Sequence, residues 1–250
     1  MPNYTVEAIV LKRYNFAEKD RILTLLTPNH GKIRAIAKGV RRPGSKLAGH
    51  LELFSHTKIF LATGRNLDII TQAQLLEANH AWESNLGFIS WSFYLAEIVE
   101  KVTAEREENY PLFRLYRQVS NALKTSHRPE ILVSYFEMRL LDILGYCPNL
   151  HNCCDCGSDL DRANFGLHQQ RQGFLCCDCR TKWQLQSYDQ ATLEVLRFFL
   201  QHEKGSKMHE VEDRIVKQTR SVMSTLLGQI MECKSKSSGF IKQANLVMGC

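Results

Sequence analysis

The densest group of chemically reactive side chains in the sequence is a pair of Cys-x-x-Cys motifs. Cys153 and Cys156 form the first motif, and Cys176 and Cys179 form the second after a gap of 19 residues. In each motif the two thiolates can converge on one ion across a tight turn, and four thiolates complete a tetrahedral Zn²⁺ site that leaves no position for water. The spacing therefore predicts one structural zinc per chain, holding a segment with few apolar residues of its own.

Neighbouring side chains leave the exact ligand set open. Cys154 and Cys177 offer a set shifted by one residue, and His151 is a possible substitute ligand. An iron–sulfur cluster would use the same type of ligand. Six of the nine cysteines fall within residues 153–179, and the first residues show no signal-peptide pattern, so metal binding is favoured over disulfides.

Positive charge is the second feature, and it is concentrated in the first third of the chain. The formal net charge is +6, and residues 1–80 carry twelve basic and six acidic side chains, a difference equal to that net charge. One run of cations in this segment contains no acidic residue: Lys32, Arg34, Lys38, Arg41, Arg42 and Lys46. Such a patch suits a polyanion such as nucleic acid, although a solvated basic loop is the simpler alternative.

Two aromatic residues lie among further cations close to the amino terminus. We expect Tyr14 and Phe16 in the loop after the first strand, with Lys12, Arg13 and Arg21 around them. Single-stranded nucleic acid binding needs this combination, because bases stack on rings while phosphates meet charges. Packing of the two rings within the loop is the alternative.

Motifs of known enzyme classes do not appear in the sequence. The glycine-rich segment 39–46 has Ser45 before Lys46, which reverses the order in the phosphate loop of nucleotide hydrolases. No nucleophile elbow or zinc-protease helix is present. We therefore expect no catalytic residues and no enzymatic activity.

The elements that must position these residues follow from two periodicities. Short segments rich in Val, Ile, Leu and Thr predict five strands: residues 4–12, 21–27, 32–37, 53–62 and 67–71. Five strands fit a small closed OB-type barrel better than a sandwich, and an SH3-like barrel is the alternative that stays open. From about residue 82 the apolar period becomes helical, and five amphipathic stripes begin near residues 91, 112, 132, 193 and 215. Pro111 and Pro129 stand at the expected starts of the second and third helices.

The predicted fold class is therefore α+β, with an N-terminal five-stranded OB-type barrel followed by an α-helical domain that contains an inserted four-cysteine zinc module. We expect the barrel over residues 1–80 and the insert over residues 147–184. The helical domain would comprise residues 81–146 together with residues 185–250.

With these parts in order, the sequence resembles the RecO family of bacterial DNA repair proteins, which are recombination mediators. The resemblance is carried by Ala8-Ile-Val-Leu-Lys12, Glu18-x-Asp20-Arg21, Leu144-Gly145-Tyr146-x-Pro148, and Gly173-Phe174-Leu175 before the second cysteine motif. It implies binding of single- and double-stranded DNA and annealing of complementary strands. It also implies partnership with RecR and with the C-terminal tail of single-stranded DNA-binding protein, and help in loading RecA.

Taken together, the charges and the resemblance define an expected DNA-binding set: Lys12, Arg13, Tyr14, Phe16, Arg21, Lys32, Arg34, Lys38, Arg41, Arg42 and Lys46. No apolar run approaches the roughly 20 residues of a membrane span, and we expect a cytoplasmic protein that joins the nucleoid when active. Without the resemblance, two other functions would be open. One is a zinc-ribbon RNA-binding or transcription factor, and the other is a metal-dependent nuclease or hydrolase.

Overall fold

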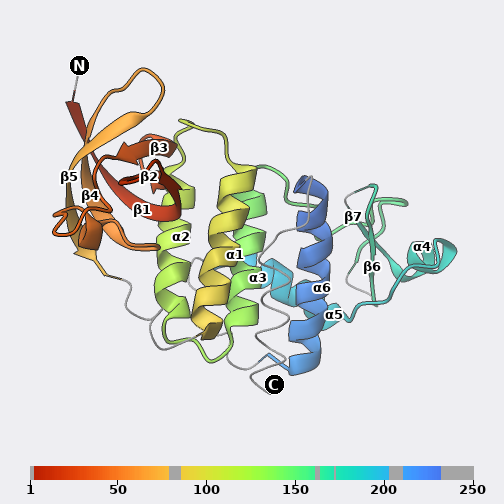
Figure 1. Ribbon diagram of the computed structural model, residues 1–250. Helices are drawn as coiled ribbons and strands as arrows, with labels where there is room; N and C mark the ends of the chain where they lie inside the picture. The colour runs from red at the N-terminus through yellow and green to blue at the C-terminus, as the bar shows by residue number, and fades with distance from the viewer. Residues whose placement is uncertain (1–2, 79–85, 161–163, 172, 203–210, 232–250) are drawn as a thin grey trace. The chain divides into compact units, whose positions relative to one another are not determined.

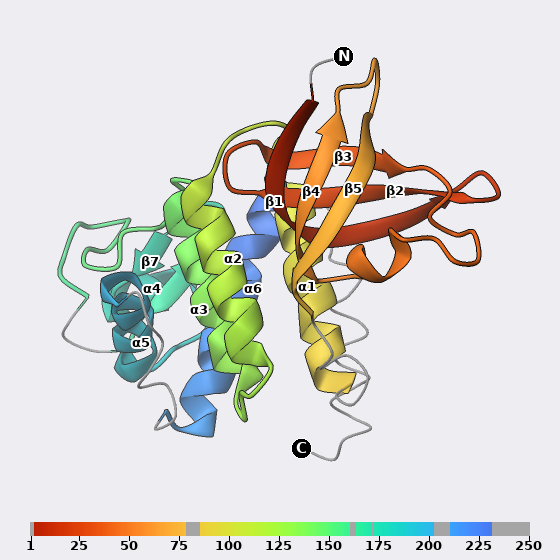
Figure 2. The same ribbon diagram turned by 90° about the vertical axis from the view of Figure 1, so that its left-hand side faces the viewer.

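The structure of the protein is a computed structural model that describes residues 3–78, 86–160, 164–171, 173–202 and 211–231 (Figures 1 and 2). These residues form two compact units, one extending to Lys124 and the other beginning at Thr125. The three domain ranges expected from the sequence remain a prediction.

The first unit is built on a closed five-stranded barrel, as expected. Its strands are β1 (Asn3–Phe16), β2 (Asp20–Thr27), β3 (Gly31–Ala37), β4 (His56–Ala62) and β5 (Asp68–Glu77), and they pair in the order β1-β2-β3-β5-β4. β3 and β5 run parallel, and the other described pairs are antiparallel. A 3₁₀ helix, η1 (Ala48–His50), lies between β3 and β4. This is the strand arrangement of an OB fold.

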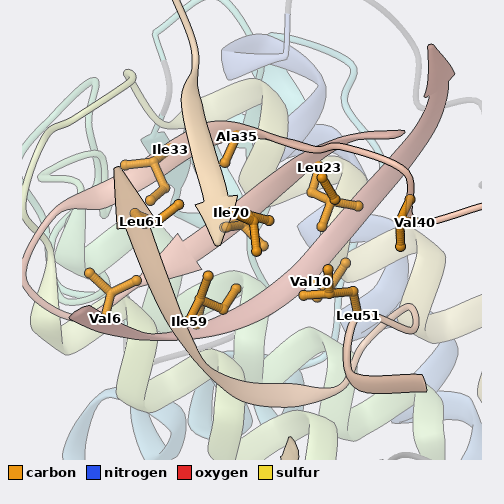
Figure 3. Close-up of a cluster of buried hydrophobic side chains, with 13 residues drawn as sticks. Val6, Val10, Leu23, Ile33, Ala35, Val40, Leu51, Ile59, Leu61 and Ile70 are labelled. Atoms are coloured by element: carbon orange, nitrogen blue, oxygen red, sulfur yellow. The ribbon is translucent and has the colours of Figure 1, made fainter. Parts of the chain in front are cut away.

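The core of the barrel is formed by the side chains on the inward-facing side of each strand. Because side chains alternate between the two faces of a strand, every second residue reaches the interior. Val10, Leu23, Ile33, Ile59 and Ile70 point into this core from the five different strands and are all nearly fully buried (Figure 3). The alternate residues of each strand point away from the core and form the outer face of the barrel.

Three strands have boundaries that differ clearly from those expected. β5 continues to Glu77 instead of ending at residue 71, because it stays paired with β4 as far as His56. β1 pairs with β2 as far as Phe16 opposite Asp20, so Tyr14 and Phe16 lie in a strand and not in a loop. The longer β1 is possible because only residues 17–19 are needed for the turn, in which Ala17 adopts a φ of 50°. β4 begins at His56 instead of residue 53, because Phe54 has a φ of 61° and interrupts the extended backbone.

Two helices, α1 (Leu86–Val102) and α2 (Tyr110–Leu123), belong to the same unit as the barrel. α1 contacts β1, and α2 contacts β2. The Asn109 side chain caps α2 by accepting a hydrogen bond from the Leu112 amide at 2.9 Å, and Pro111 occupies the first turn as expected.

The segment between these helices is fastened to the barrel by a buried carboxylate. Asp68 in β5 is 1% exposed and accepts hydrogen bonds from the Tyr4 hydroxyl at 2.6 Å and the Arg106 guanidinium at 2.7 Å. The Gly64 amide donates a third bond at 3.2 Å. Burial opposes ionisation of Asp68, but these hydrogen bonds outweigh it and lower the pKa of its carboxyl group.

The second unit consists of three helices that pack on one another and a cysteine-containing module between two of them. The helices are α3 (Pro129–Ile143), α5 (Gln190–Gln201) and α6 (Asp213–Ile230). Between α3 and α5 lie β6 (Gly166–His168), β7 (Gly173–Leu175) and α4 (Cys177–Lys182), which confirms the inserted module. Its small core stacks the Phe165 ring against Tyr188, with Phe174 edge-on. No helix among the described residues combines the length and hydropathy needed to cross a membrane.

Candidate metal centre and nucleic-acid interface

The two Cys-x-x-Cys motifs bring four sulfur atoms together in the second unit. The Sγ atoms of Cys153, Cys156, Cys176 and Cys179 all lie within 4.8 Å of one another, and the Cys156 and Cys176 sulfurs are 3.7 Å apart. A tetrahedral zinc with bonds of about 2.3 Å places its sulfur ligands about 3.8 Å apart. The cluster therefore has the dimensions of a site that binds one metal ion through four thiolates.

Local backbone geometry places each pair of sulfurs. In the first motif the Cys153 amide donates to the Ser158 carbonyl at 2.8 Å, and the Gly157 amide donates to the Cys153 carbonyl at 3.0 Å. This tight turn requires a φ of 74° at Gly157, where glycine is favoured. In the second motif Cys176 directly precedes α4 and Cys179 lies in its first turn, so the helix aligns both side chains.

The surroundings of the cluster shift the pKa values of Cys156 and Cys179 in opposite directions. The Ser158 hydroxyl, 3.0 Å from the Cys156 sulfur, and the Ser158 amide lower the pKa of Cys156 to about 6. Burial, followed by hydrogen bonding to the neighbouring thiols, raises the pKa of Cys179. Four adjacent thiolates repel one another unless a cation lies among them. The donor set thus fits a bound divalent metal ion.

The three alternative ligands lie outside this group. Cys154 is exposed, and its side chain lies against Gly173, where an added Cβ would come within 2.9 Å of the Cys154 sulfur. Cys177 is half-buried, and its thiol donates to the Asp178 carboxylate at 3.6 Å. His151 is exposed. Among the described residues, the four-cysteine group does not include these three.

A second candidate site lies on the outer face of β1, β2 and β3. On β2, Thr24 is paired with Lys12 of β1 and with Arg34 of β3, while Ile22 is paired with Tyr14. Because directly paired residues point to the same side of a sheet, these side chains form two rows about 7 Å apart. The row of cations and the row with Tyr14 are therefore neighbours on one face of the barrel.

Several of the expected DNA-binding side chains are open to solvent on this face and in the loop that follows it. Tyr14 is 66% exposed and Phe16 is 46% exposed, which is unusual for aromatic residues. Four exposed cations form no side-chain hydrogen bond or ion pair with any described residue: Arg34, Lys38, Arg42 and Lys46.

Four other cations of the expected set already have partners in the first unit. Two are ion-paired, Lys12 with Glu100 at 2.8 Å and Arg13 with Glu52 at 2.5 Å. Two donate weaker hydrogen bonds, Arg21 to the Asn15 side chain at 3.3 Å and Arg41 to the Ala17 carbonyl at 3.4 Å. The two carboxylates offset the positive charge of Lys12 and Arg13, whereas the neutral acceptors leave Arg21 and Arg41 charged.

Lys32 is the one cation of the expected set that is buried. It points outward on β3, on the same side as Arg34, but the end of α1 covers it. Its ammonium group donates to the Glu100 carbonyl and to the Thr103 carbonyl at 2.6 Å, and burial lowers its pKa. Lys32 thus caps the last turn of α1, and we leave it out of the interface.

Two exposed cations on the barrel were missed by the sequence analysis. Lys19 lies in the β1–β2 turn, and Arg65 lies in the connection between β4 and β5. In OB folds these two connections border the ligand-binding face. Once the five strands had been assigned from the sequence, the positions of Lys19 and Arg65 in these connections could have identified both as candidate binding residues.

The strand order, the basic and aromatic outer face and the four-thiol cluster define an OB-fold protein with a helical second unit that contains four cysteines able to hold a metal ion. The chain belongs to the Recombination protein O (RecO) family. The model for the N-terminal part of that family matches residues 1–79, and the model for its C-terminal part matches residues 84–238.

Curated relatives support the same assignment. The chain is 39% identical over 176 residues to the DNA repair protein RecO of Roseiflexus sp. (strain RS-1), a match that covers 70% of this chain and 62% of that protein. It is 34% identical over 178 residues to a Dehalococcoides mccartyi protein of the same name, covering 71% and 70% of the two chains. The match to the Thermoanaerobacter sp. (strain X514) DNA repair protein RecO has 30% identity over 241 residues and covers 94% and 95%.

Proposed function

We propose that this protein is a non-enzymatic mediator of DNA repair and recombination that binds single- and double-stranded DNA and anneals complementary strands. With RecR, it would help to load RecA on DNA coated by single-stranded DNA-binding protein. This work would take place in the cytoplasm, at the nucleoid. Family membership supports the repair role, and the open cations on the outer face of the barrel support the binding step.

The observation that carries the proposal is a group of exposed cations without ion-pair partners among the described residues: Arg34, Lys38, Arg42 and Lys46. A DNA phosphate can therefore approach them without first breaking an ion pair, and condensed counterions are released when it does. Phosphate contacts carry no sequence information, so the base edges of the bound strand stay free to pair.

Annealing requires two mutually repelling strands to come close together. A basic surface lowers that repulsion on its own, so we propose that neither ATP nor strand cleavage is needed. For strands coated by single-stranded DNA-binding protein, capture of that protein's C-terminal tail by the helical residues would bring the mediator to the DNA.

The four-cysteine cluster enters this proposal as a structural zinc site. Cys153, Cys156, Cys176 and Cys179 would hold one ion with all four coordination positions filled. The bound metal would supply folding free energy to the module, whose own core is small. No step of annealing passes through it.

The direct test is annealing of complementary oligonucleotides, naked or coated with single-stranded DNA-binding protein, in the absence of ATP. We expect the protein to accelerate both reactions. Deleting the C-terminal tail of the coating protein should abolish only the second. An ATP requirement, metal-dependent cleavage or indifference to the tail would each contradict a separate part of the proposal.

A matched pair of double variants assigns the activity to the proposed face. Arg34→Ala with Lys38→Ala removes two open cations, and Lys58→Ala with Lys217→Ala removes the same charge elsewhere. Lys58 is a suitable control because it lies on β4, outside the three strands of the proposed face, and its neighbour in the strand register of β1 is the acidic Glu7. Only the first variant should slow annealing of naked strands, and equal effects of both on that reaction would refute the assignment to this face.

RNA binding by an OB fold is the second candidate, because the same cations and rings suit any single strand. Competition between DNA and RNA oligonucleotides of one sequence separates the two functions. A clear preference for RNA would favour an RNA-binding or transcription factor.

A further inference from the structure

The metal-binding module carries an exposed Trp–Arg pair that the function proposed above does not use. Trp183, the residue that ends α4, is 43% exposed. The guanidinium carbon of Arg171, in the β6–β7 connection, lies 5.4 Å from the centre of the Trp183 ring. This distance is within the range of a cation–π interaction.

The pair is held in place by the residues around it. Asp155 forms an ion pair with Arg171 and accepts a hydrogen bond from the Trp183 indole nitrogen at 3.4 Å. The His168 ring packs edge-on against Trp183, with ring centres 4.9 Å apart. One hydrogen bond to Asp155 and one ring contact with His168 orient the indole, and the same carboxylate holds Arg171 beside it; the indole is nevertheless open to solvent.

Asp155 also connects this pair to the metal centre. It lies between Cys153 and Cys156, in the turn that presents two of the four sulfurs. Cys179 lies in α4 and its carbonyl accepts a hydrogen bond from the Trp183 amide at 3.0 Å. The turn and helix that would bind the metal are therefore the same elements that position Asp155 and Trp183.

The surroundings of the ring favour a nucleobase over an apolar protein partner. The exposed residues next to Trp183 and Arg171 in the chain are polar or charged: Gln170, Lys182 and Gln184. An apolar partner would need a continuous apolar patch, which these residues do not provide. A nucleobase needs a flat aromatic or guanidinium surface to stack on and a nearby cation for the phosphate, and it tolerates polar neighbours.

We propose that Trp183 and Arg171 form a stacking platform for an unpaired base of single-stranded DNA, positioned by the metal-binding module through Asp155. This inference rests on the proposed DNA-binding function and adds a second contact to it. The contact would act on bases and not on phosphates, and it would favour single-stranded over double-stranded DNA because paired bases have no free face.

The test compares binding of oligothymidylate with binding of an oligonucleotide of equal length and charge that contains abasic sites. In the parent protein the bases should improve affinity, and Trp183→Ala should remove at least about fivefold of that advantage. Trp183→Phe keeps a ring against His168 and should retain part of it. The dependence of affinity on salt should not change in either variant, because stacking releases no counterions.

Two controls keep the outcomes distinct. Tyr146 is 55% exposed in the same unit, and Tyr146→Ala should leave the base-dependent advantage intact. Metal content and thermal unfolding of each variant report whether the module is still folded. If Trp183→Ala is unfolded, the Trp183→Phe variant and the abasic comparison decide the question.

The platform is refuted if abasic sites make no difference to the parent protein, or if Trp183→Ala and Trp183→Phe, folded and metal-loaded, keep the full advantage. Either result leaves the proposed function standing as long as the Arg34→Ala/Lys38→Ala variant weakens DNA binding. If the parent protein binds no DNA at all, the proposed function itself fails, and the platform fails with it.

Discussion

Lys32 and Arg34 lie two residues apart on the same face of β3, and the structure predicts opposite consequences for their loss. The Lys32 ammonium donates to two carbonyls at the end of α1, whereas the Arg34 side chain has no described partner. Lys32→Ala should therefore weaken folding, and Arg34→Ala should weaken DNA binding. The two variants form a matched pair because each removes one positive charge.

The expected magnitudes follow from the contacts. A hydrogen bond to a charged group contributes about 1.5–3 kcal/mol to the free energy of unfolding. The alanine variant loses two such bonds but no longer buries a charged ammonium group, so Lys32→Ala should lower that free energy by about 2 kcal/mol. A loss of that size lowers the melting temperature of a protein of this length by about 4–8 °C. Calorimetry or thermal unfolding followed by circular dichroism measures it.

For Arg34→Ala the quantity to measure is the dependence of DNA affinity on salt. One phosphate contact contributes about 0.7 to the logarithmic slope for a single strand, so between 50 and 200 mM salt the affinity of the variant should fall about 2.6-fold less than that of the parent. Fluorescence anisotropy with a labelled oligonucleotide is sufficient. The assignment would be refuted if Lys32→Ala reduced the salt slope and left stability unchanged. It would also be refuted if Arg34→Ala lowered stability and left the salt slope unchanged.

Three further predictions concern the metal, a carboxylate and a glycine. Cys156→Ser should lose the metal ion and unfold or aggregate, whereas Cys154→Ser should be milder; full metal occupancy in Cys156→Ser, measured by plasma emission, would contradict the ligand set. Burial opposes ionisation of Asp68, but the hydrogen bonds that Asp68 accepts hold the pKa of its carboxyl group below the usual value. The ionised carboxylate therefore stabilises the folded protein fully above about pH 4, and this contribution is lost as the pH falls through the folded pKa. Asp68→Asn should therefore be less stable than the parent in urea at pH 6, with a difference that shrinks toward pH 3; a constant difference would argue against this. Gly31→Ala should destabilise strongly in the same assay, because Gly31 has a φ of 58° and the added Cβ would lie 1.8 Å from the Glu107 carbonyl oxygen; wild-type stability would show that this close approach does not hold in solution.

The parts of the site that depend on local spacing could be predicted from the sequence. Two Cys-x-x-Cys motifs place four sulfurs correctly because each pair needs only a turn or the first turn of a helix. The five strands and the five longer helices followed from their apolar periods in the same way. Strand ends were less predictable, since the length of β1 depends on continued pairing with β2 as far as Phe16.

The parts that depend on distant contacts could not be predicted. The two-residue period correctly places Lys32 and Arg34 on one side of β3, but it does not show that α1, nearly 70 residues later, covers only the first of them. The Trp183 and Arg171 pair was missed for the same reason. The two residues lie 11 positions apart and meet only because the β6–β7 connection and the end of α4 converge on Asp155.

The two proposed DNA contacts share a property that suits annealing. Arg34 and the other open cations would hold phosphates, and Trp183 would hold the flat face of a base. Neither contact occupies the hydrogen-bonding edge of a base, which is the part that must meet the complementary strand. Bound DNA would thus stay competent to pair, and because pairing removes the free base face on which stacking depends, the finished duplex would lose the Trp183 contact and bind less tightly than the strands from which it formed.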